Sequence, residues 1–464
     1  MMRLISTQLV LTFAVVFVGC GNTAQAPSHG SAPRQFLIHS AAPTNPVGQA
    51  SDLIPLYVHH VVIIFQENRT PDNLFHGLPN ADIAESGLNS KHQTLRLQPI
   101  ALNAPYDLDH SHLAFLEMYH RGKMDGADKV RCSGDCPPNP QFTYVKQSDV
   151  EPYFALAEQY VFADRMFQTN QGPSFPAHQF IIAGTSAPTA DSDLFAAENV
   201  WSRHGPPHGL GFESSGCGAP PTDYVSLINP AGKENSTYPP CFEHRTVLDL
   251  LDAQKVDWKY YSTTGGWTAA YWNGPSAIHH IRFGPDWANV DPNSAQVLRD
   301  IKNGELPAVS WVIPTGQASD HAFTTDGSGP SWVAAVVNAI GNSKYWQDTV
   351  VFITWDDWGG FYDHVPPPIF NSYEYGFRVP LIVVSPYSKS GYVSHVMHDF
   401  GSILRFIEEA FGLPTLGYAD ARADDLLDCF DFNQMPRTFR TVAAPMDAKH
   451  FLEDTGPALD PDDD

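Results

Sequence analysis

Runs of apolar, β-branched residues recur along the chain and predict strands that are buried on both faces. The clearest are residues 61–64 and 350–353, and further apolar runs cover 309–314 and 379–385. Strands without regular polar alternation are typical of parallel sheets that are covered on both sides. The pattern therefore favours a large, mostly parallel central sheet.

Other segments carry the apolar spacing of helices. Residues 400–411 place Phe400, Leu404, Ile407 and Phe411 along one stripe, which is the core-facing side of an amphipathic helix. Further helices are predicted over 177–184, 246–253 and 331–342, and residues 152–166 predict a helix followed by a short strand. The mixture of buried strands and helices predicts an α/β fold with helices on both faces of the sheet.

Polar residues follow directly at the carboxyl ends of two predicted strands. Glu67 and Asn68 come after the first strand, and Asp356 and Asp357 come after the strand at 350–353. Open α/β sheets bind ligands in the crevice beyond the carboxyl ends of their strands. Adjacent carboxylates are costly unless a cation neutralises them, although they can also point apart and be solvated. We interpret the repeated placement as a metal site.

Ser174 stands between two prolines in the segment GPSFP, residues 172–176. Proline fixes the backbone on both sides, so the hydroxyl is presented rigidly, as a nucleophile requires. The segment also precedes the predicted helix 177–184, whose N-terminal amides attract an oxyanion. The alternative is that Ser174 is the N-cap of this helix, and the local sequence alone favours that alternative.

Several histidines lie next to acidic residues in predicted loops. His110 follows Asp109, His321 follows Asp320 beyond a predicted strand, and His364 follows Asp363. His279 and His280 form a further pair. A lone histidine is more often a surface or capping residue, but histidines beside carboxylates are candidates for acid–base or ligand roles.

Charge limits the partners of the chain. The 464 residues include 51 acids and 27 bases, for a net charge of −24, and 43% are hydrophobic, which allows a large core. Such an acidic surface argues against nucleic acid as a partner. A small phosphate ester remains possible, because a bound metal inverts the local charge.

The first 50 residues resemble an export segment and a tether. Residues 1–20 combine Arg3, an apolar run and the sequence Phe17-Val18-Gly19-Cys20, which resembles a lipobox. The prediction is an exported protein that is lipid-anchored at Cys20 and lies in the periplasm or at the cell surface; the alternative is an ordinary secretory signal. Residues 21–50 are rich in Ala, Ser, Pro and Gly and predict a flexible linker.

The remaining cysteines and the chain ends complete the predicted organisation. In an exported protein, the close spacings predict local disulfides Cys132–Cys136 and Cys217–Cys241, with Cys429 left over. Residues 51–440 are expected to form a single catalytic domain with an irregular insertion around 186–300. Residues 441–464 end in DPDDD and are expected to be a disordered acidic tail.

Four segments together resemble a known family. They are ENRTPDNLFHG at 67–77, DLDH at 107–110, GPSFP at 172–176 and DDWGGFYDHVPPP at 356–368. They are similar to motifs of the bacterial phosphoesterase family that includes phosphatidylcholine-type phospholipases C and an acid phosphatase branch. The resemblance extends over residues 58–412 and implies an alkaline-phosphatase-like fold, a sandwich with long loop insertions.

The resemblance also implies roles for individual residues. Ser174 matches the family's nucleophile, which displaces the N-cap interpretation. The implied metal ligands are Glu67, Asp356 and Asp357, and Asn68 is an implied phosphate or metal contact. The implied pocket histidines are His110, His280, His321 and His364, with His110 or His321 as the acid that protonates the leaving group. The oxygen-rich ligand set suits Mg²⁺, Mn²⁺ or Ca²⁺, and Zn²⁺ remains an alternative.

Two departures from the family pattern concern the substrate. Pro176-Ala177-His178 stands where phospholipase-like members have Pro-Asn-Arg, and Pro71 replaces a common Phe. Together with the acidic surface and the lack of room for further C-terminal β domains, the change at 177–178 favours an acid-phosphatase-like monoesterase. A phospholipase C-type phosphodiesterase is the alternative within this class, acting on a phospholipid. From another class, a non-catalytic ligand-binding lipoprotein on the same fold is possible, although the complete set of site residues argues against it.

Overall fold

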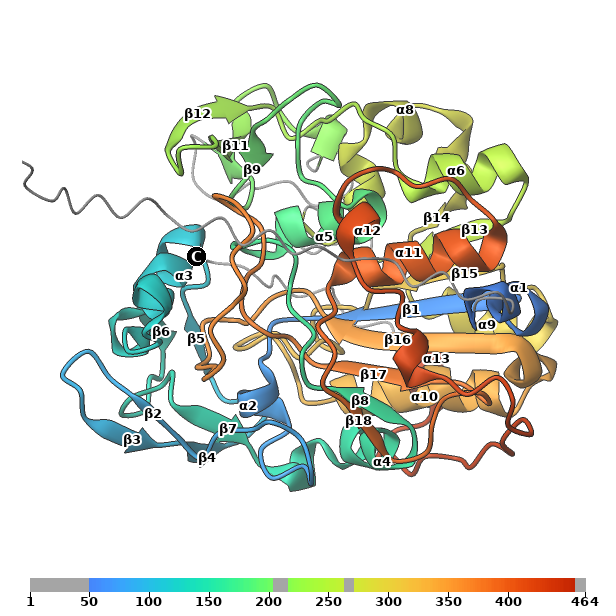
Figure 1. Ribbon diagram of the computed structural model, residues 1–464, viewed down its shortest axis with the longest axis horizontal. Helices are drawn as coiled ribbons and strands as arrows, with labels where there is room; N and C mark the ends of the chain where they lie inside the picture. The colour runs from blue at the N-terminus through green and yellow to red at the C-terminus, as the bar shows by residue number, and fades with distance from the viewer. Residues whose placement is uncertain (1–49, 203–215, 263–270, 455–464) are drawn as a thin grey trace, which may run out of the picture. The chain divides into compact units, whose positions relative to one another are not determined.

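The structure is a computed structural model, and it describes residues 50–202, 216–262 and 271–454 (Figure 1). Cys20, nearly all of the predicted export segment and linker, and the last ten residues lie outside the described residues. Within the described residues, no helix has the length and apolar character that a bilayer crossing requires.

An eight-stranded sheet forms the centre of the fold. Its order is β14 (Val290–Asp291), β13 (Trp258–Tyr261), β15 (Val309–Val312), β1 (His60–Gln66), β16 (Thr349–Trp355), β17 (Leu381–Val384), β8 (Val161–Ala163) and β18 (Tyr392–Ser394). Only β17 runs antiparallel to its neighbours in this sheet. The large, mostly parallel central sheet of an α/β fold is thereby confirmed.

The two central strands are buried along nearly their whole length. β1 and β16 pair in parallel from His60 and Thr349 to Gln66 and Trp355. All residues of β16, and all of β1 after His60, are buried. This explains why both strands lack polar alternation, since helices cover both of their faces.

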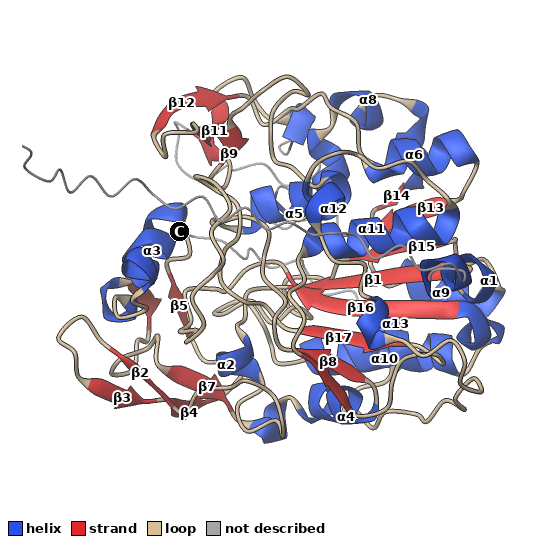
Figure 2. Cartoon of the chain, viewed as in Figure 1, coloured by secondary structure: helices blue, strands red, loops and turns tan. Residues whose placement is uncertain are grey.

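Helices lie on both sides of the central sheet (Figure 2), and side chains on opposite faces of β16 contact the two layers. Phe352 packs against Phe406 of α11 (Phe400–Phe411), and on the opposite face Trp355 packs against Tyr153 of α4 (Glu151–Gln159). α5 (Ser174–Ala183) and α6 (Val247–Gln254) contact α11, whereas α9 (Gln296–Asn303) and α10 (Gly329–Gly341) join the layer of α4. The remaining α-helices are α1 (Ile54–Tyr57), α2 (Pro71–Leu74), α3 (His112–Tyr119), α8 (His279–Arg282), α12 (Ala419–Arg422) and α13 (Ala448–Glu453).

Short strands build the loops around this core. The antiparallel sheet of the insertion contains β9 (Phe195–Ala196), β10 (Trp201–Ser202), β11 (Asp223–Ile228) and β12 (Glu234–Tyr238). Three two-stranded pairs unite β2 (Ser86–Leu88) with β3 (Thr94–Arg96), β4 (Gln98–Ile100) with β7 (Thr143–Val145), and β5 (Tyr106–Leu108) with β6 (Cys132–Gly134). Both predicted disulfides are present, and Cys429 is free and buried.

Two expectations about chain organisation need correction. The predicted irregular insertion around 186–300 contains α6, β13 and β14, and these last two strands form one edge of the central sheet, where β14 pairs with β13 and β13 pairs with β15. Part of the predicted disordered tail is ordered: Phe451 of α13 packs against Trp332 of α10 at 5.3 Å between ring centroids. Residues 441–454 are ordered because apolar side chains such as Val442 and Phe451 pack into the core. The acidic end of the chain lies outside the described residues.

Candidate active site

The ends of β1 and β16 bring two polar pairs together. Gln66 pairs with Trp355, so Glu67-Asn68 and Asp356-Asp357 leave the sheet side by side. The amide of Asp356 donates to the carbonyl of Gln66 at 3.0 Å, which extends the ladder by one residue. All four side chains at this edge are buried, although the positions are strand-end loops. The Glu67-Asn68 pair and the Asp356-Asp357 pair therefore lie next to each other at the carboxyl edge of the sheet.

Asn68 connects the two strand ends. Its backbone N–H donates to Oδ1 of Asp356 at 3.1 Å, and its side-chain Nδ2 donates to Oδ2 of Asp357 at 3.0 Å. The residue has φ of +58°, a left-handed conformation that Asn adopts more readily than most residues. Gly359 must pass close by, since a Cβ at that position would lie 2.4 Å from the carbonyl oxygen of Asn68.

The carboxylates are held mainly by backbone donors. The amide of Asp357 donates to Oδ1 of Asp356, and the amide of Gly359 donates to Oδ1 of Asp357, each at 2.7 Å. Oδ2 of Asp356 is buried and has no hydrogen-bond partner among the described residues. The same holds for Oδ1 of Asn68. Buried polar atoms are nearly always bonded, so two such oxygens beside three acids fit a site for a divalent cation.

Ser174 lies at the first position of α5 with its hydroxyl on these acids. Its Oγ donates to Oε2 of Glu67 at 3.3 Å and lies 3.4 Å from Oδ2 of Asp357. Pro173 is the N-cap residue, and no side chain caps this helix end. The N-cap interpretation of Ser174 is therefore wrong. It fails because Pro173 takes the extended backbone conformation, which places Ser174 inside the helix.

Two of the predicted histidines lie together beside Asn68. Nδ1 of His110 donates to the carbonyl of Leu108 at 2.8 Å, which leaves Nε2 to accept from Nδ2 of Asn68 at 3.2 Å. Nδ1 of His321 lies 2.7 Å from the carbonyl of Ala322. The two rings are buried and 5.8 Å apart between centroids. Both imidazoles are thus held through Nδ1. Nε2 of each ring is therefore the nitrogen left for hydrogen bonding or proton transfer.

The other two predicted histidines bind carboxylates elsewhere. His280 on α8 contacts Glu243 through Nδ1 at 2.6 Å and Asp249 through Nε2 at 2.9 Å. These contacts, chiefly the hydrogen bond to Asp249, raise the pKa of His280 to about 9. The carboxylates that hydrogen-bond to His280 are thus Glu243 and Asp249, and those that hydrogen-bond to His364 are Asp72 and Asp82.

His364 belongs to a second buried acidic group, which already contains a cation. Nδ1 of His364 lies 2.8 Å from Oδ2 of Asp72, and the guanidinium of Arg378 donates to Asp363 at 3.0 Å and to Asp72 at 3.3 Å. Burial alone raises the pKa of Asp72, but the hydrogen bond with His364 and the charge of Arg378 bring it below its ordinary value. Arg378 neutralises this acidic group. The group therefore has a structural role, which is to hold the loop after β16 in place.

His178 is the site residue that the sequence analysis did not identify. Its Nε2 lies 3.1 Å from Oε1 of Glu67, and one donor atom each from Glu67, His178 and Asp356 lie within 4.8 Å of one another. The predicted helix 177–184 excluded Ser174, whereas α5 begins at Ser174 and so places His178 four residues on, on the same helix face. The sequence analysis treated the position only as a departure from the family pattern.

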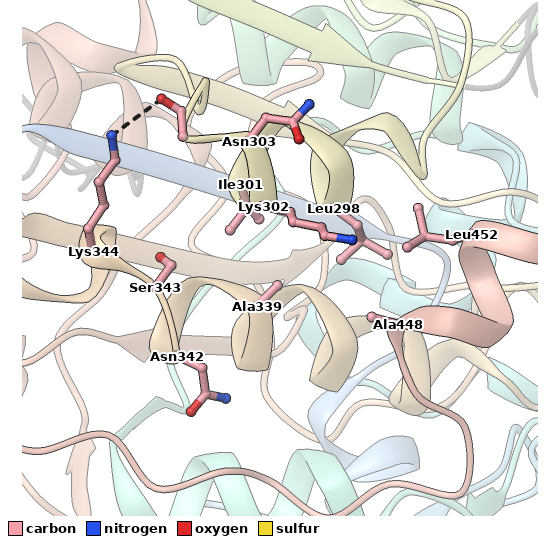
Figure 3. A pocket seen from close by; sticks show the side chains of 11 residues that line it. Leu298, Ile301, Lys302, Asn303, Ala339, Asn342, Ser343, Lys344, Ala448 and Leu452 are labelled. Atoms are coloured by element: carbon pink, nitrogen blue, oxygen red, sulfur yellow. Dashed lines mark hydrogen bonds between the residues drawn. The ribbon is translucent and has the colours of Figure 1, made fainter.

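A separate hollow is lined by residues of α9, α10 and α13 (Figure 3). It is bounded by the ends of α9 and α10 and by α13, and Lys302 and Lys344 are its charged residues. Asn303 precedes β15 and Lys344 precedes β16, so this hollow adjoins the amino ends of the parallel strands. It contains no acid or histidine, and the carboxylate group at the opposite strand ends remains the candidate active site.

Comparisons with known proteins agree with the motifs. The model of the "Phosphoesterase family" matches residues 58–414. The chain is 26% identical to "Hemolytic phospholipase C" of Pseudomonas aeruginosa, over 81% of this chain and 56% of that protein. It is 23% identical to "Phospholipase C B" of Mycobacterium tuberculosis, over 89% of this chain and 88% of that protein. The chain thus spans about half the length of the first of these relatives.

Solved structures show only a loose likeness. Murine ectonucleotide pyrophosphatase/phosphodiesterase 5, in an inactive form with AMP, has a TM-score of 0.39 at 6% identity, covering 81% of this chain and all (100%) of that chain. An alkaline phosphatase superfamily protein from Vibrio parahaemolyticus has a TM-score of 0.34 at 12% identity, covering 79% of this chain and 71% of that chain.

Proposed function

The chain belongs to the phosphoesterase family, and on this premise we propose that it hydrolyses phosphate esters through a phosphoserine formed on Ser174. The observation that carries the proposal is the position of the Ser174 hydroxyl, within hydrogen-bond reach of both Glu67 and Asp357. A serine alone is a weak nucleophile, and it needs neighbouring groups that remove or redirect its proton. Buried carboxylates at this distance supply such groups.

Four oxygen-bearing residues would hold a divalent metal here: Glu67, Asn68, Asp356 and Asp357. The unpartnered Oδ2 of Asp356 and Oδ1 of Asn68 support this assignment. When bound, the cation supplies Lewis-acid chemistry: it lowers the pKa of the serine hydroxyl and neutralises phosphate oxygens. The chain's own contribution is to keep the acids, the amide and the hydroxyl in fixed relative positions.

The reaction that we propose has two displacements. Ser174 Oγ attacks phosphorus, the bond from phosphorus to the alcohol oxygen breaks, and the serine proton passes to a neighbouring carboxylate. Of the two candidate acids, protonated His321 is favoured as the donor of the Nε2 proton to the departing alcohol, since its Nδ1 is held by a backbone carbonyl, whereas Nε2 of His110 accepts from Asn68. Water then attacks the phosphoserine and gives a proton to the now neutral histidine, the bond from phosphorus to Oγ breaks, and Oγ regains its proton from the carboxylate.

Two ester classes are candidates. The Ala177-His178 departure favours a monoester, as in acid phosphatases. Relatives named phospholipase C favour a diester, because such enzymes cleave between phosphate and a lipid alcohol. Initial rates on p-nitrophenyl phosphate and p-nitrophenyl phosphorylcholine separate the classes: faster cleavage of the first supports the monoesterase, and faster cleavage of the second supports the phosphodiesterase.

Ser174→Ala in a single-turnover experiment with a ³²P-labelled phosphate ester tests the nucleophile. We expect the wild type to retain label on the protein and the variant to lose both the label and at least about 10³-fold in rate. Ser310→Ala is a matched control, because Ser310 is equally buried and its Oγ has no partner among the described residues. A wild-type rate in Ser174→Ala would show that Ser174 is not the nucleophile.

We also propose that the protein acts outside the cytoplasm. The lipobox-like sequence at Cys20 and the two disulfides support export, because disulfides persist in oxidising compartments. Metabolic labelling with a radioactive fatty acid should mark the wild type, and Cys20→Ala should abolish the label. An unlabelled wild type would favour an ordinary secretory signal.

A further inference from the structure

One face of α5 reaches both oxygens of the Glu67 carboxylate. Ser174 Oγ lies 3.3 Å from Oε2, and His178 Nε2 lies 3.1 Å from Oε1. All three side chains are fully buried. Residues four apart on a helix lie above one another, so this helix turn presents a hydroxyl and an imidazole to a single acid.

The opposite edge of the His178 ring is fixed by Tyr260 of β13. The Tyr260 hydroxyl lies 2.8 Å from the carbonyl oxygen of Trp272, which can only accept, and 3.1 Å from Nδ1 of His178. A phenol has one proton, and the carbonyl contact uses it. The hydroxyl therefore accepts from His178, so Nδ1 carries a hydrogen and Nε2 is the nitrogen that faces Glu67.

Without a cation, His178 can make this 3.1 Å contact only as a protonated ring that donates from Nε2 to the carboxylate. With a cation between the two atoms, a neutral ring offers its Nε2 lone pair, and both atoms act as ligands. Asp356 adds a third donor atom within 4.8 Å, and its Oδ2 is buried without a partner among the described residues. Two ligands bound to one Zn²⁺ at about 2.0–2.2 Å stand roughly 3.0–3.5 Å apart, which matches the contact between His178 and Glu67.

We propose that His178 is a nitrogen ligand of the metal, and that Tyr260 orients it from the second sphere. The proposal deepens the function proposed above and rests on its metal site. Imidazole nitrogen suits Zn²⁺ and related transition ions, whereas an all-oxygen set suits Mg²⁺ and Ca²⁺. His178 therefore directs this site toward a zinc-class ion.

Metal binding to the purified, chelator-stripped protein tests this without any turnover. Equilibrium dialysis against Zn²⁺, Mg²⁺ and Ca²⁺, followed by elemental analysis, gives the affinities, and the visible spectrum of the Co²⁺ form reports nitrogen ligation. We expect the wild type to prefer Zn²⁺. His178→Gln should lose at least about 10²-fold in Zn²⁺ affinity, keep its Mg²⁺ affinity and change the Co²⁺ spectrum.

Tyr260→Phe is the second variant, because it keeps the ring and removes only the acceptor for Nδ1. It should weaken Zn²⁺ binding by about 10-fold while retaining the nitrogen-ligated Co²⁺ spectrum. His450→Gln is the matched control, since His450 is exposed on α13. Near-ultraviolet circular dichroism of each metal-free variant confirms that it is folded.

The outcomes separate this inference from the proposed function. Equal Zn²⁺ affinity and an identical Co²⁺ spectrum in His178→Gln would overturn the ligand role, whatever the rate of ester hydrolysis. A wild type that prefers Mg²⁺ would overturn the zinc preference. An active Ser174→Ala variant would contradict the phosphoserine intermediate. It would not alter the result of the metal titration for His178.

Discussion

The side-chain amide of Asn68 donates to Oδ2 of Asp357 at 3.0 Å, across 289 residues of sequence. The same Nδ2 lies 3.2 Å from Nε2 of His110, so its two hydrogens serve two different segments. Asn68 therefore connects the end of β1, the loop after β16 and the loop before α3 in one hydrogen-bonded unit.

Asn68→Gly should lower kcat/KM for phosphate esters by about 10²-fold and weaken metal binding by about 10–100-fold, because it removes both side-chain bonds. Glycine tolerates the positive φ, so the backbone should remain in place. Asn80→Gly is the matched control, since Asn80 has φ of +65°. Activity assays and metal titrations provide the measurements, and equal values for the two variants would contradict a role for the Asn68 side chain.

Removal of the metal should abolish hydrolysis and leave the fold intact. Dialysis against a chelator, followed by elemental analysis and an assay, should give an inactive protein that recovers on addition of a divalent ion. Far-ultraviolet circular dichroism should be unchanged, because backbone amides already hold Asp356 and Asp357. Full activity in protein verified to be metal-free would rule out a metal-dependent mechanism.

Arg378→Met should destabilise the protein by about 3–5 kcal/mol, since it leaves buried Asp363 and Asp72 without their cation. Urea unfolding gives the free energy. Arg131→Met is the control, because the Arg131 side chain is 84% exposed in its pair with Asp109 and should contribute less than about 1 kcal/mol. A loss in Arg378→Met as small as that of the control would mean that another group neutralises the two acids.

Stability should fall with rising pH through the ionisation of Glu408 in α11. Burial, and then the charge of Asp420, raise the pKa of Glu408 to about 8. The folded state thus keeps a proton that the unfolded chain releases near its ordinary pKa of about 4.5, so stability declines between these two values. Glu408→Gln should be roughly neutral at pH 4 and gain about 1–2 kcal/mol over the wild type at pH 9.

The measurement is urea unfolding of both proteins across this pH range. Glu453→Gln is the control, because the Glu453 side chain is 67% exposed and its replacement should leave the pH profile unchanged. A Glu408→Gln profile parallel to that of the wild type would show that the carboxyl is ionised in the folded protein.

Phe451→Ala should cost about 3 kcal/mol, since it removes a buried ring from its contact with Trp332. Thermal unfolding measures the loss. Lys449→Ala, on the exposed side of the same helix, should change stability by less than about 0.5 kcal/mol. Equal melting temperatures for the two variants would mean that α13 does not dock in solution.

The sequence predicted the central fold because β1 and β16 are buried on both faces and contain uninterrupted apolar runs, Val61 to Phe65 and Val350 to Ile353. β1 and β16 were found for this reason, and their shared carboxyl edge brought Glu67 and Asp356 together as expected. Thr246 and Asp399 mark the starts of α6 and α11 by the capping residues that helix ends require.

The parts that were missed depend on contacts between distant segments. Whether a histidine faces an acid across the fold is not encoded locally, so the family resemblance favoured His280 as a pocket residue and treated His178 only as a departure from the motif. His280 meets Glu243 and Asp249, whereas His178 meets Glu67, which lies 111 residues earlier. The order of residues 441–454 was missed for the same reason, because it depends on a partner in α10.

The left-handed turn at Asn68 has a consequence for how the site can change. There is no space for a Cβ at Gly359 against this turn, so the two loops pack in direct backbone contact. Neither loop can be lengthened or re-aimed alone without breaking the contact. A larger residue at position 359 should therefore displace both loops together, and with them the contact between Asn68 and Asp357.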